Sequence, residues 1–218
     1  MQRVADTGAT KGPGFSDPAG TWNRRFSEPG YHFGTAPNAW LAAQAGVWPV
    51  GARVLCVADG EGRNSVWLAR RGLAVQAFDI AEQGVAKARR LAAEQGVEVD
   101  YVVADCDSFA WPVASCDGVA AIFIQFADPL LRERLFARMV ASLRPGGTLV
   151  LQGYTPRQLE YRTGGPPLVS HLYTAAWLRQ AFQGLEILAL EEYEADLAEG
   201  SGHQGRSALV GLVARKAP

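Results

Sequence analysis

The stretch CVADGEGRNS, from Cys56 to Ser65, lies where an apolar strand pattern gives way to a helix pattern. Gly60 and Gly62 fall in the turn between the two. Glycines in such a turn let backbone N–H groups approach a ligand closely, and several classes of nucleotide cofactor are bound in this way. The stretch therefore predicts a cofactor-binding turn, and the rest of the chain must indicate which cofactor it holds.

Strand and helix patterns alternate along most of the chain. The expected strands are residues 53–57, 73–79, 99–105, 117–126, 148–154, 185–193 and 207–214. Helical patterns cover residues 39–46, 64–72, 82–96, 128–143 and 174–182. Strands joined by helices pair in parallel with right-handed crossovers. The fold class predicted is α/β: a doubly wound, Rossmann-like sheet of about seven strands, whose last two strands share only the loop 194–205 and pair antiparallel.

The length of 218 residues favours one domain. Residues 1–20 are rich in Gly, Pro, Thr and Asp and are predicted to be a flexible arm. Residues 21–218 are then a single domain, in which residues 21–50 form an aromatic N-terminal cap. No run of apolar residues is long enough to span a membrane, and no secretory signal is visible at the N-terminus.

Composition narrows the range of partners. Lys and Arg number 21 against 22 Asp and Glu, so no strong net field favours nucleic acid. The three cysteines have neither disulfide-like nor zinc-like spacing, and they are expected to be small core residues of a cytoplasmic protein. A small-molecule partner is expected, with no nucleic acid and no membrane; the oligomeric state stays open.

Acids at strand ends distinguish between cofactors. Asp79 ends the second strand, 17 residues after Gly62, where its carboxylate can accept hydrogen bonds from both ribose hydroxyls. Asp105 ends the third strand, where it can take an adenine amino group while the amide of Cys106 faces a ring nitrogen. Because no second mononucleotide half follows, the pattern favours an adenosyl ligand over NAD.

Five segments now carry a family resemblance: VLCVADGEGRNSVWLA, VQAFDI, VVADCDSF, DGVAAIFIQF and LRPGGTLVLQ. In this order and spacing, residues 22–216 resemble a class I S-adenosylmethionine-dependent methyltransferase. WNRRF…GYHFGTAPNAWL and EGSGHQG…VGLVARK also resemble the tellurite-resistance and thiopurine methyltransferase-like group. The resemblance implies S-adenosyl-L-methionine as cofactor and S-adenosyl-L-homocysteine as product.

The resemblance also implies the cofactor-binding set. Asn64 is expected to be both helix N-cap and cofactor neighbour, Gln125 to lie beside the sulfonium, and Arg25 to pair with the cofactor carboxylate. The complete predicted set is Arg25, Tyr31, Ala58, Asp59, Gly60, Gly62, Asn64, Asp79, Ile80, Asp105, Cys106 and Gln125. The chain departs from the family at Cys56, where an acid is usual, and at Ala58, where glycine is usual. Asp59 is expected to compensate for the missing acid.

We expect the two ends of the domain to form the part of the active site that binds the methyl acceptor. His203 and Arg206 are predicted to be catalytic, with His171 as the other candidate base. The family's loop histidine is followed by arginine, whereas Gln204 stands here, so tellurium chemistry is not carried over. The predicted function is metal-independent methyl transfer to a small molecule, a thiol or another soft nucleophile among the options. The alternatives are a cofactor-binding regulatory or partner protein with a degenerate methyltransferase fold, and NAD-dependent reduction.

Overall fold

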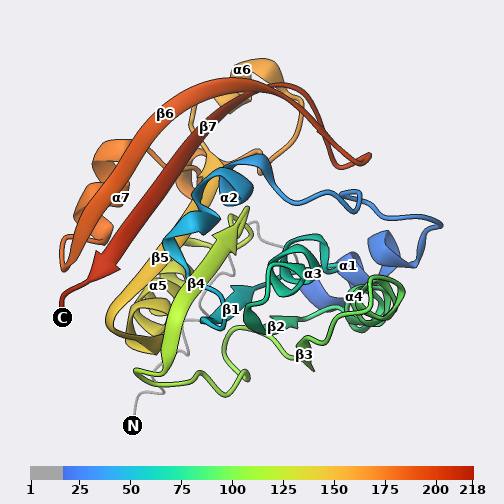
Figure 1. The fold of residues 1–218 in the computed structure, drawn as a ribbon. Coiled ribbons are helices and arrows are strands. Elements are labelled where there is room, and N and C mark those ends of the chain that lie inside the picture. The colour runs from blue at the N-terminus through green and yellow to red at the C-terminus, as the bar shows by residue number, and fades with distance from the viewer. Residues whose placement is uncertain (1–16) are drawn as a thin grey trace, which may run out of the picture.

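The computed structural model describes residues 17–218, and its centre is one seven-stranded sheet in the order β3-β2-β1-β4-β5-β7-β6 (Figure 1). Strands β1 to β5 pair with one another in parallel, and β7 pairs antiparallel with both β5 and β6. This confirms the predicted fold class. The strands are β1 Arg53–Val57, β2 Ala74–Asp79, β3 Asp100–Val103, β4 Cys116–Ile122, β5 Leu143–Tyr154, β6 Leu185–Glu199 and β7 His203–Lys216.

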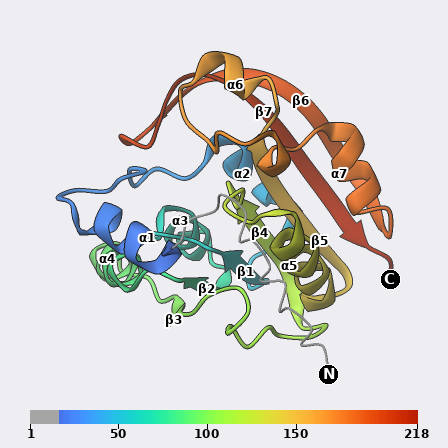
Figure 2. The same ribbon diagram turned by 180° about the vertical axis from the view of Figure 1, so that it is seen from behind.

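Helices cover both faces of the sheet because the strand residues alternate between two apolar cores. Leu55 and Val57 of β1 join the core beneath α5 and α7, whereas Val54 and Cys56 join the core beneath α2, α3 and α4. Figure 2 shows the α5 and α7 side from behind. The helices are α1 Pro18–Ser27, α2 Ala39–Gln44, α3 Arg63–Arg70, α4 Glu82–Glu94, α5 Pro129–Ser142, α6 Gln158–Tyr161 and α7 Ala175–Ala181, with short 3-10 turns η1 Ala45–Val47 and η2 Val169–His171.

Two helices begin with the same local signal. Asp128 precedes Pro129, and its carboxylate accepts a hydrogen bond of 2.9 Å from the backbone N–H of Leu131 at the start of α5. Asp17 precedes Pro18 in α1 and accepts a bond of the same length from the N–H of Gly20. Both Asp-Pro sequences therefore begin a helix, although Asp17 and Pro18 were predicted to be part of the flexible arm.

The structure corrects three sequence expectations. Residues 18–20, placed in the flexible arm, belong to α1, and the rest of that arm up to residue 16 lies outside the described residues. The loop expected over 194–205 is strand for most of its length: β6 and β7 remain paired up to Glu199 opposite His203, and only Gly200–Gly202 turn the chain. The long hairpin arches along one side of the molecule (Figure 1).

The third correction concerns the start of α3. Gly62, with a φ of +89°, occupies the N-cap position and no side chain caps the helix. Asn64, expected as the cap, lies inside the first turn, and its Oδ1 accepts a bond of 2.9 Å from the backbone N–H of Asn38.

No helix among residues 17–218 is long and apolar enough to cross a membrane.

Candidate active site

The quoted turn adopts a backbone that favours glycine at three alternate positions. Ala58, Gly60 and Gly62 have φ angles of +49°, +61° and +89°. At Gly62 an added Cβ would lie 2.7 Å from the Cβ of Ala88 on α4, so this glycine lets the turn pack against that helix. Ala58 adopts the left-handed conformation without being glycine, at the carboxyl end of β1 where a nucleotide ligand is expected.

Asp79 is tied directly to this turn. Its carboxylate accepts hydrogen bonds from the N–H of Gly60, at 2.9 Å, and of Ala81, at 2.8 Å. Burial raises the pKa of Asp79 to about 6, although these backbone bonds act in the opposite direction. Ile80 follows at the strand end and is partly exposed. Each carboxylate oxygen can still accept a second bond, so the residue keeps acceptor capacity for a ribose.

Asp59 forms hydrogen bonds within the turn, and its predicted contact with the cofactor stays a prediction. Its carboxylate accepts hydrogen bonds from the backbone N–H and the hydroxyl of Ser65, which also lies 2.8 Å from the hydroxyl oxygen of Tyr101. Burial raises the pKa of Asp59 to about 7. The Asp59 carboxylate therefore stabilises the turn through Ser65. Cys56 is a buried free thiol, as expected for a small core residue.

Asp105 and Cys106 follow β3 at the same edge of the sheet. The Asp105 carboxylate accepts bonds from the backbone N–H groups of Asp107 and Ser108, at 2.9 and 2.6 Å, and these bonds lower its pKa. Cys106 is buried next to the stacked rings of Phe78 and Phe109. Asp105 is exposed, so its outer oxygen is accessible to a ligand. The adenine contact stays a prediction.

The N-terminal segment covers the turn. The ring of Phe26, only 2% exposed, lies above Gly60, where an added Cβ would meet it at 3.2 Å. Glu61 holds the segment in place: it accepts a bond of 2.6 Å from the N–H of His32 and pairs with Lys87 at 2.8 Å. Lys87 also donates to two backbone carbonyls of the segment, those of Glu28 and Gly30.

Two predicted cofactor residues belong to this covering segment. The guanidinium carbon of Arg25 lies 4.8 Å from the centre of the Trp22 ring. The Tyr31 hydroxyl is buried and has no hydrogen-bond partner within residues 17–218. The contacts of both residues with a cofactor stay predictions.

Gln125 is engaged with the protein itself. Its amide donates to the carbonyls of Tyr154, at 2.9 Å, and His171, at 3.0 Å, and accepts a bond from the Tyr154 N–H. The His171 ring, in turn, bonds through Nδ1 to the Gln125 carbonyl at 2.8 Å. These bonds join the ends of β4 and β5 to η2 and give both residues a structural role. The predicted place of Gln125 beside the sulfonium and the role of His171 as a base stay predictions.

A buried charged network lies between the hairpin and the turn. Glu199 of β6 accepts bonds from Arg63 at 2.9 Å, from His203 at 3.1 Å and from Asn38 at 3.0 Å. The side chains of Arg63, Glu199 and His203 are only 7, 11 and 10% exposed. Sequence analysis predicted His203 and missed Asn38, Arg63 and Glu199, which come from three separate parts of the chain.

The network sets the protonation states of its members. Burial raises the pKa of Glu199, but the hydrogen bond from His203 and the charge of Arg63 prevail and bring it to about 2. Burial lowers the pKa of His203 further than the Glu199 carboxylate raises it. At neutral pH the network therefore holds one ion pair, Arg63 with Glu199, and a neutral imidazole that is able to accept a proton.

Aromatic rings enclose His203. The ring centres of Phe33 and Phe123 lie 4.5 and 4.3 Å from that of His203, and Tyr154 lies at 5.8 Å. Phe123, directly after β4, has a φ of +56°, a strained conformation for an aromatic residue of a kind that occurs often at functional sites. The carboxyl ends of β4 and β5 thus meet the hairpin at His203.

The predicted approach of the two chain ends is present in the structure, but Arg206 does not take part in it. The N–H of Gly202 donates to the carbonyl of His32 at 2.9 Å, which joins the hairpin tip to the N-terminal segment. Arg206 is about half exposed and pairs with Glu194 at 2.8 Å and Asp196 at 3.5 Å. Because strand side chains alternate, it points to the face opposite His203.

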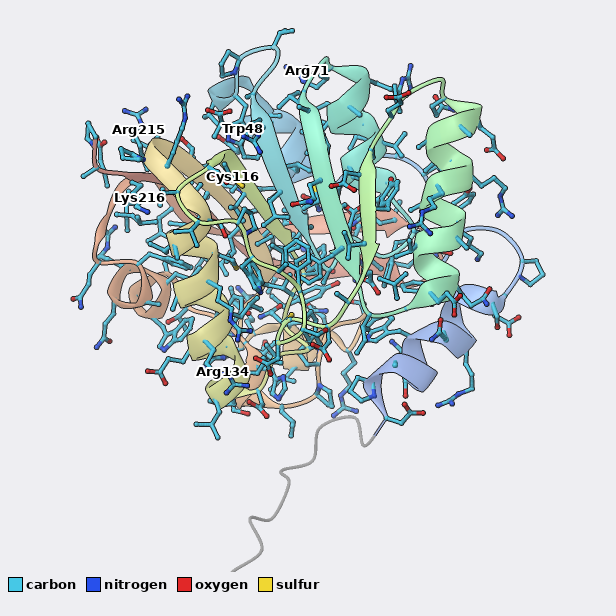
Figure 3. All side chains as sticks on the ribbon, turned by 90° about the horizontal axis from the view of Figure 1, so that it is seen from below. Trp48, Arg71, Cys116, Arg134, Arg215 and Lys216 are labelled. Atoms are coloured by element: carbon cyan, nitrogen blue, oxygen red, sulfur yellow. The ribbon has the colours of Figure 1, made fainter. Side chains whose placement is uncertain are left out.

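A groove of about 820 Å³ lies away from these residues, at the amino ends of β1 to β4. Cys116, at the start of β4, lines it and is labelled in the view from below (Figure 3). Ligands of doubly wound sheets bind at the carboxyl ends instead, so this groove is not the expected cofactor site. Within residues 17–218, no group of three or more His, Cys, Asp or Glu is arranged to hold a metal.

Known proteins share this sequence and fold. Residues 54–147 match a family of methyltransferase domains. A ubiquinone biosynthesis O-methyltransferase of Xanthomonas axonopodis pv. citri (strain 306) is 36% identical over 166 residues, which cover 67% of this chain and 68% of that one. The chain belongs to the S-adenosylmethionine-dependent methyltransferases of class I, with S-adenosyl-L-methionine as cofactor.

Solved structures agree on the fold. A protein that converts a disulfide bond into a thioacetal group in echinomycin biosynthesis has a TM-score of 0.73 at 17% identity, over 91% of this chain and 92% of that one. TehB from Haemophilus influenzae has a TM-score of 0.68 at 18% identity, over 84% of this chain and 63% of that one. These two likenesses show the fold, and the family match and the sequence relative show that the chain is a methyltransferase.

The turn fits the cofactor of this class. Its alternate left-handed residues, the remaining lone pairs of the buried Asp79 carboxylate and the exposed Asp105 are groups of the kind that an adenosyl group requires. Phe26 closes the turn from above at Gly60.

Proposed function

We propose that the enzyme methylates a small-molecule acceptor held between the cofactor turn and the hairpin, with His203 as general base. The observation that carries this proposal is the pairing of His203 with Glu199 beside Phe123, at the carboxyl end of β4. A buried neutral imidazole hydrogen-bonded through Nδ1 to a carboxylate has its Nε2 available for a proton.

The cofactor would be held by the predicted set of residues. Asp79 would accept the ribose hydroxyls, Asp105 and the Cys106 amide would bind adenine, and the Ala58–Gly62 turn would approach the methionine part. Arg25, Tyr31 and Phe26 would cover the cofactor and exclude water from the methyl group. When bound, the cofactor supplies an activated methyl group on a sulfonium.

The proposed reaction is a proton transfer coupled to a displacement. The acceptor X–H gives its proton to Nε2 of His203, and its electron pair forms the new bond to the methyl carbon. The bound cofactor would supply the methyl carbon and keep the electron pair of the carbon–sulfur bond on its sulfur, so the products would be X–CH₃, S-adenosyl-L-homocysteine and a protonated His203. The Glu199 carboxylate 3.1 Å from Nδ1 stabilises the imidazolium until the proton leaves to water.

A basic residue at this position favours an oxygen or nitrogen acceptor. A thiol ionises readily near neutral pH and gains less from a base, so the soft nucleophile considered from the sequence is the second candidate. The similar ubiquinone biosynthesis enzyme is an O-methyltransferase by name, which supports an oxygen acceptor. The aromatic N-terminal segment and the hairpin histidine also support a place near the tellurite-resistance and thiopurine methyltransferase-like group.

An acceptor screen tests this function. Purified protein, labelled S-adenosyl-L-methionine and panels of phenols, amines, carboxylic acids, thiols, selenite and tellurite are incubated, and S-adenosyl-L-homocysteine release is measured. We expect release with an oxygen or nitrogen panel, and its loss in His203→Ala. Turnover confined to thiols and unaffected by His203→Ala would contradict the role of the base.

A further inference from the structure

We propose that Glu199, held in place by Arg63 and Asn38, is a positioning residue that fixes His203 in one tautomer, with the proton on Nδ1 and Nε2 bare. The inference rests on the proposed function of His203 as base. It gives Glu199, Arg63 and Asn38 a role in the site and specifies the tautomer of His203. Neither family membership nor the identity of the acceptor provides this information.

Both oxygens of the Glu199 carboxylate accept hydrogen bonds. Its Oε2 accepts from both Arg63, at 2.9 Å, and His203 Nδ1, at 3.1 Å, while Oε1 accepts from Asn38 Nδ2 at 3.0 Å. Since an ionised carboxylate only accepts hydrogen bonds, Nδ1 must carry the proton in this contact. The neutral ring has one proton, so Nε2 keeps its lone pair.

Packing prevents the ring from turning to exchange its nitrogens. Phe33 and Phe123 lie 4.5 and 4.3 Å from the ring centre, and Gly202 next to His203 leaves room for Phe33, which an added Cβ there would meet at 2.4 Å. Asn38 is anchored separately, because its Nδ2 also donates to Gln152 at 2.6 Å. Strand β5, the N-terminal segment and the hairpin thus fix one geometry together.

Charged and titratable groups face His203 from four elements. Glu199 comes from β6 and Arg63 from α3, His32 lies in the N-terminal segment, and Tyr154 ends β5. The Glu199 carboxylate raises the pKa of His203 and the Arg63 guanidinium lowers it. Removal of the Glu199 carboxylate must therefore lower the pKa of His203, and removal of the Arg63 guanidinium must raise it.

The test is nitrogen NMR of the histidine rings, which requires no acceptor. The chain has three histidines, so His203→Gln assigns the signals of residue 203. We expect a protonated Nδ1 and an unprotonated Nε2 in the folded protein at pH 8. In Glu199→Gln we expect a mixture of tautomers and a His203 pKa lower by about half a unit or more. In Arg63→Gln we expect a higher His203 pKa.

Matched controls are available on the same elements. Glu186→Gln lies on β6 near an exposed Arg215, and Arg70→Gln lies on α3 with an exposed side chain, so both should leave the His203 signals unchanged. Spectra of the backbone amides report folding of each variant. A proton on Nε2 in the wild type, or shifts of equal sign in the Glu199 and Arg63 variants, would overturn the proposal. If the tautomer is as expected and the acceptor screen still finds no role for His203, the function as base fails and the positioning stands.

Discussion

The turn after β1 and the network beneath the β6–β7 hairpin lie at the same edge of the sheet, but the chain assembles them in different ways. The turn is local: Ala58 to Gly62 and Asp79 follow consecutive strands of a regular α/β alternation. The network is distant: Asn38, Arg63 and Glu199 are joined across as many as 161 residues. A site built from residues close in sequence can be recognised as a sequence motif. A site built from residues far apart in sequence can be recognised only in the folded structure.

Their electrostatics differ as well. Burial raises the pKa of Asp59 and Asp79 at the turn, which lack a cation in contact with their carboxylates in the described chain. Burial also acts on Glu199, but its hydrogen bond from His203 and its pairing with Arg63 prevail and bring its pKa to about 2. The turn is thus suited to neutral hydroxyl donors of a cofactor, and the network to stabilising a proton on an imidazole.

The largest expected effect tests the network. His203→Ala should lower turnover by about 10²- to 10⁴-fold, the usual contribution of a general base, and leave the affinity for S-adenosyl-L-homocysteine nearly unchanged. Steady-state kinetics with an acceptor from the screen, together with calorimetry, separate the two effects. A loss of cofactor affinity equal to the loss of turnover would mean that the two regions are not separate sites.

The next effect tests the packing of the turn. Gly62→Ala should lower the free energy of unfolding by about 2–4 kcal/mol, because a side chain at φ +89° is strained and its Cβ would lie 2.7 Å from Ala88. Gly96→Ala is the control: its φ is +65°, but nothing lies within 4 Å of the added Cβ, so about 1 kcal/mol is expected. Urea unfolding of both variants gives the difference; equal losses would show that close packing is not the reason for Gly62.

A smaller expected effect, on cofactor affinity, tests the role of Asp79 at the turn. Asp79→Asn should weaken S-adenosyl-L-homocysteine binding by about 1.5–3 kcal/mol, the value for hydrogen bonds to a charged acceptor. Ribose hydroxyls favour the ionised carboxylate, so wild-type affinity should be constant near pH 8 and fall as the pH is lowered through about 6, the pKa of Asp79. Calorimetry from pH 5 to 8 measures this. Asp79→Asn should lose the pH dependence, while Asp100→Asn, at the amino end of β3, should keep it.

The smallest effect concerns Arg206. Because it forms exposed ion pairs with Glu194 and Asp196 on the face opposite His203, Arg206→Ala should leave the midpoint of urea unfolding nearly unchanged and alter turnover by less than about twofold. A loss of turnover similar to that of His203→Ala would place the acceptor on the outer face of the hairpin.

Most of the sheet could be predicted because its periodicity is local. The strand at Arg53–Val57 was predicted with its observed bounds, and the Asp128–Pro129 start of α5 gave its first turn. The same Asp-Pro signal stands at Asp17, where α1 could have been found, but the polar composition around it favoured an arm. The hairpin was predicted too short because acidic residues and glycines resemble a loop, while backbone pairing continues through them.

The candidate site divides in the same way. Gly60, Gly62 and Asp79 follow from motif spacing, since strand ends and turn glycines are set by neighbours in sequence. Arg63 and Glu199 could not be recognised, because a charged residue in a helix start or an acidic strand looks like a solvated one until the fold buries it. Arg206 was proposed from its closeness to His203 in sequence, and strand alternation places the two on opposite faces.

The most direct test of the account is a crystal structure of the protein with bound S-adenosyl-L-homocysteine. We predict one molecule per chain, with its ribose hydroxyls on the Asp79 carboxylate and its sulfur facing the network. His203 Nε2 should lie within about 10 Å of the methyl position, near enough for an acceptor and one bridging water to fit between them. A ribose held elsewhere, or a His203 ring farther from the methyl position than this, would contradict the assignment of the turn and the network to one active site.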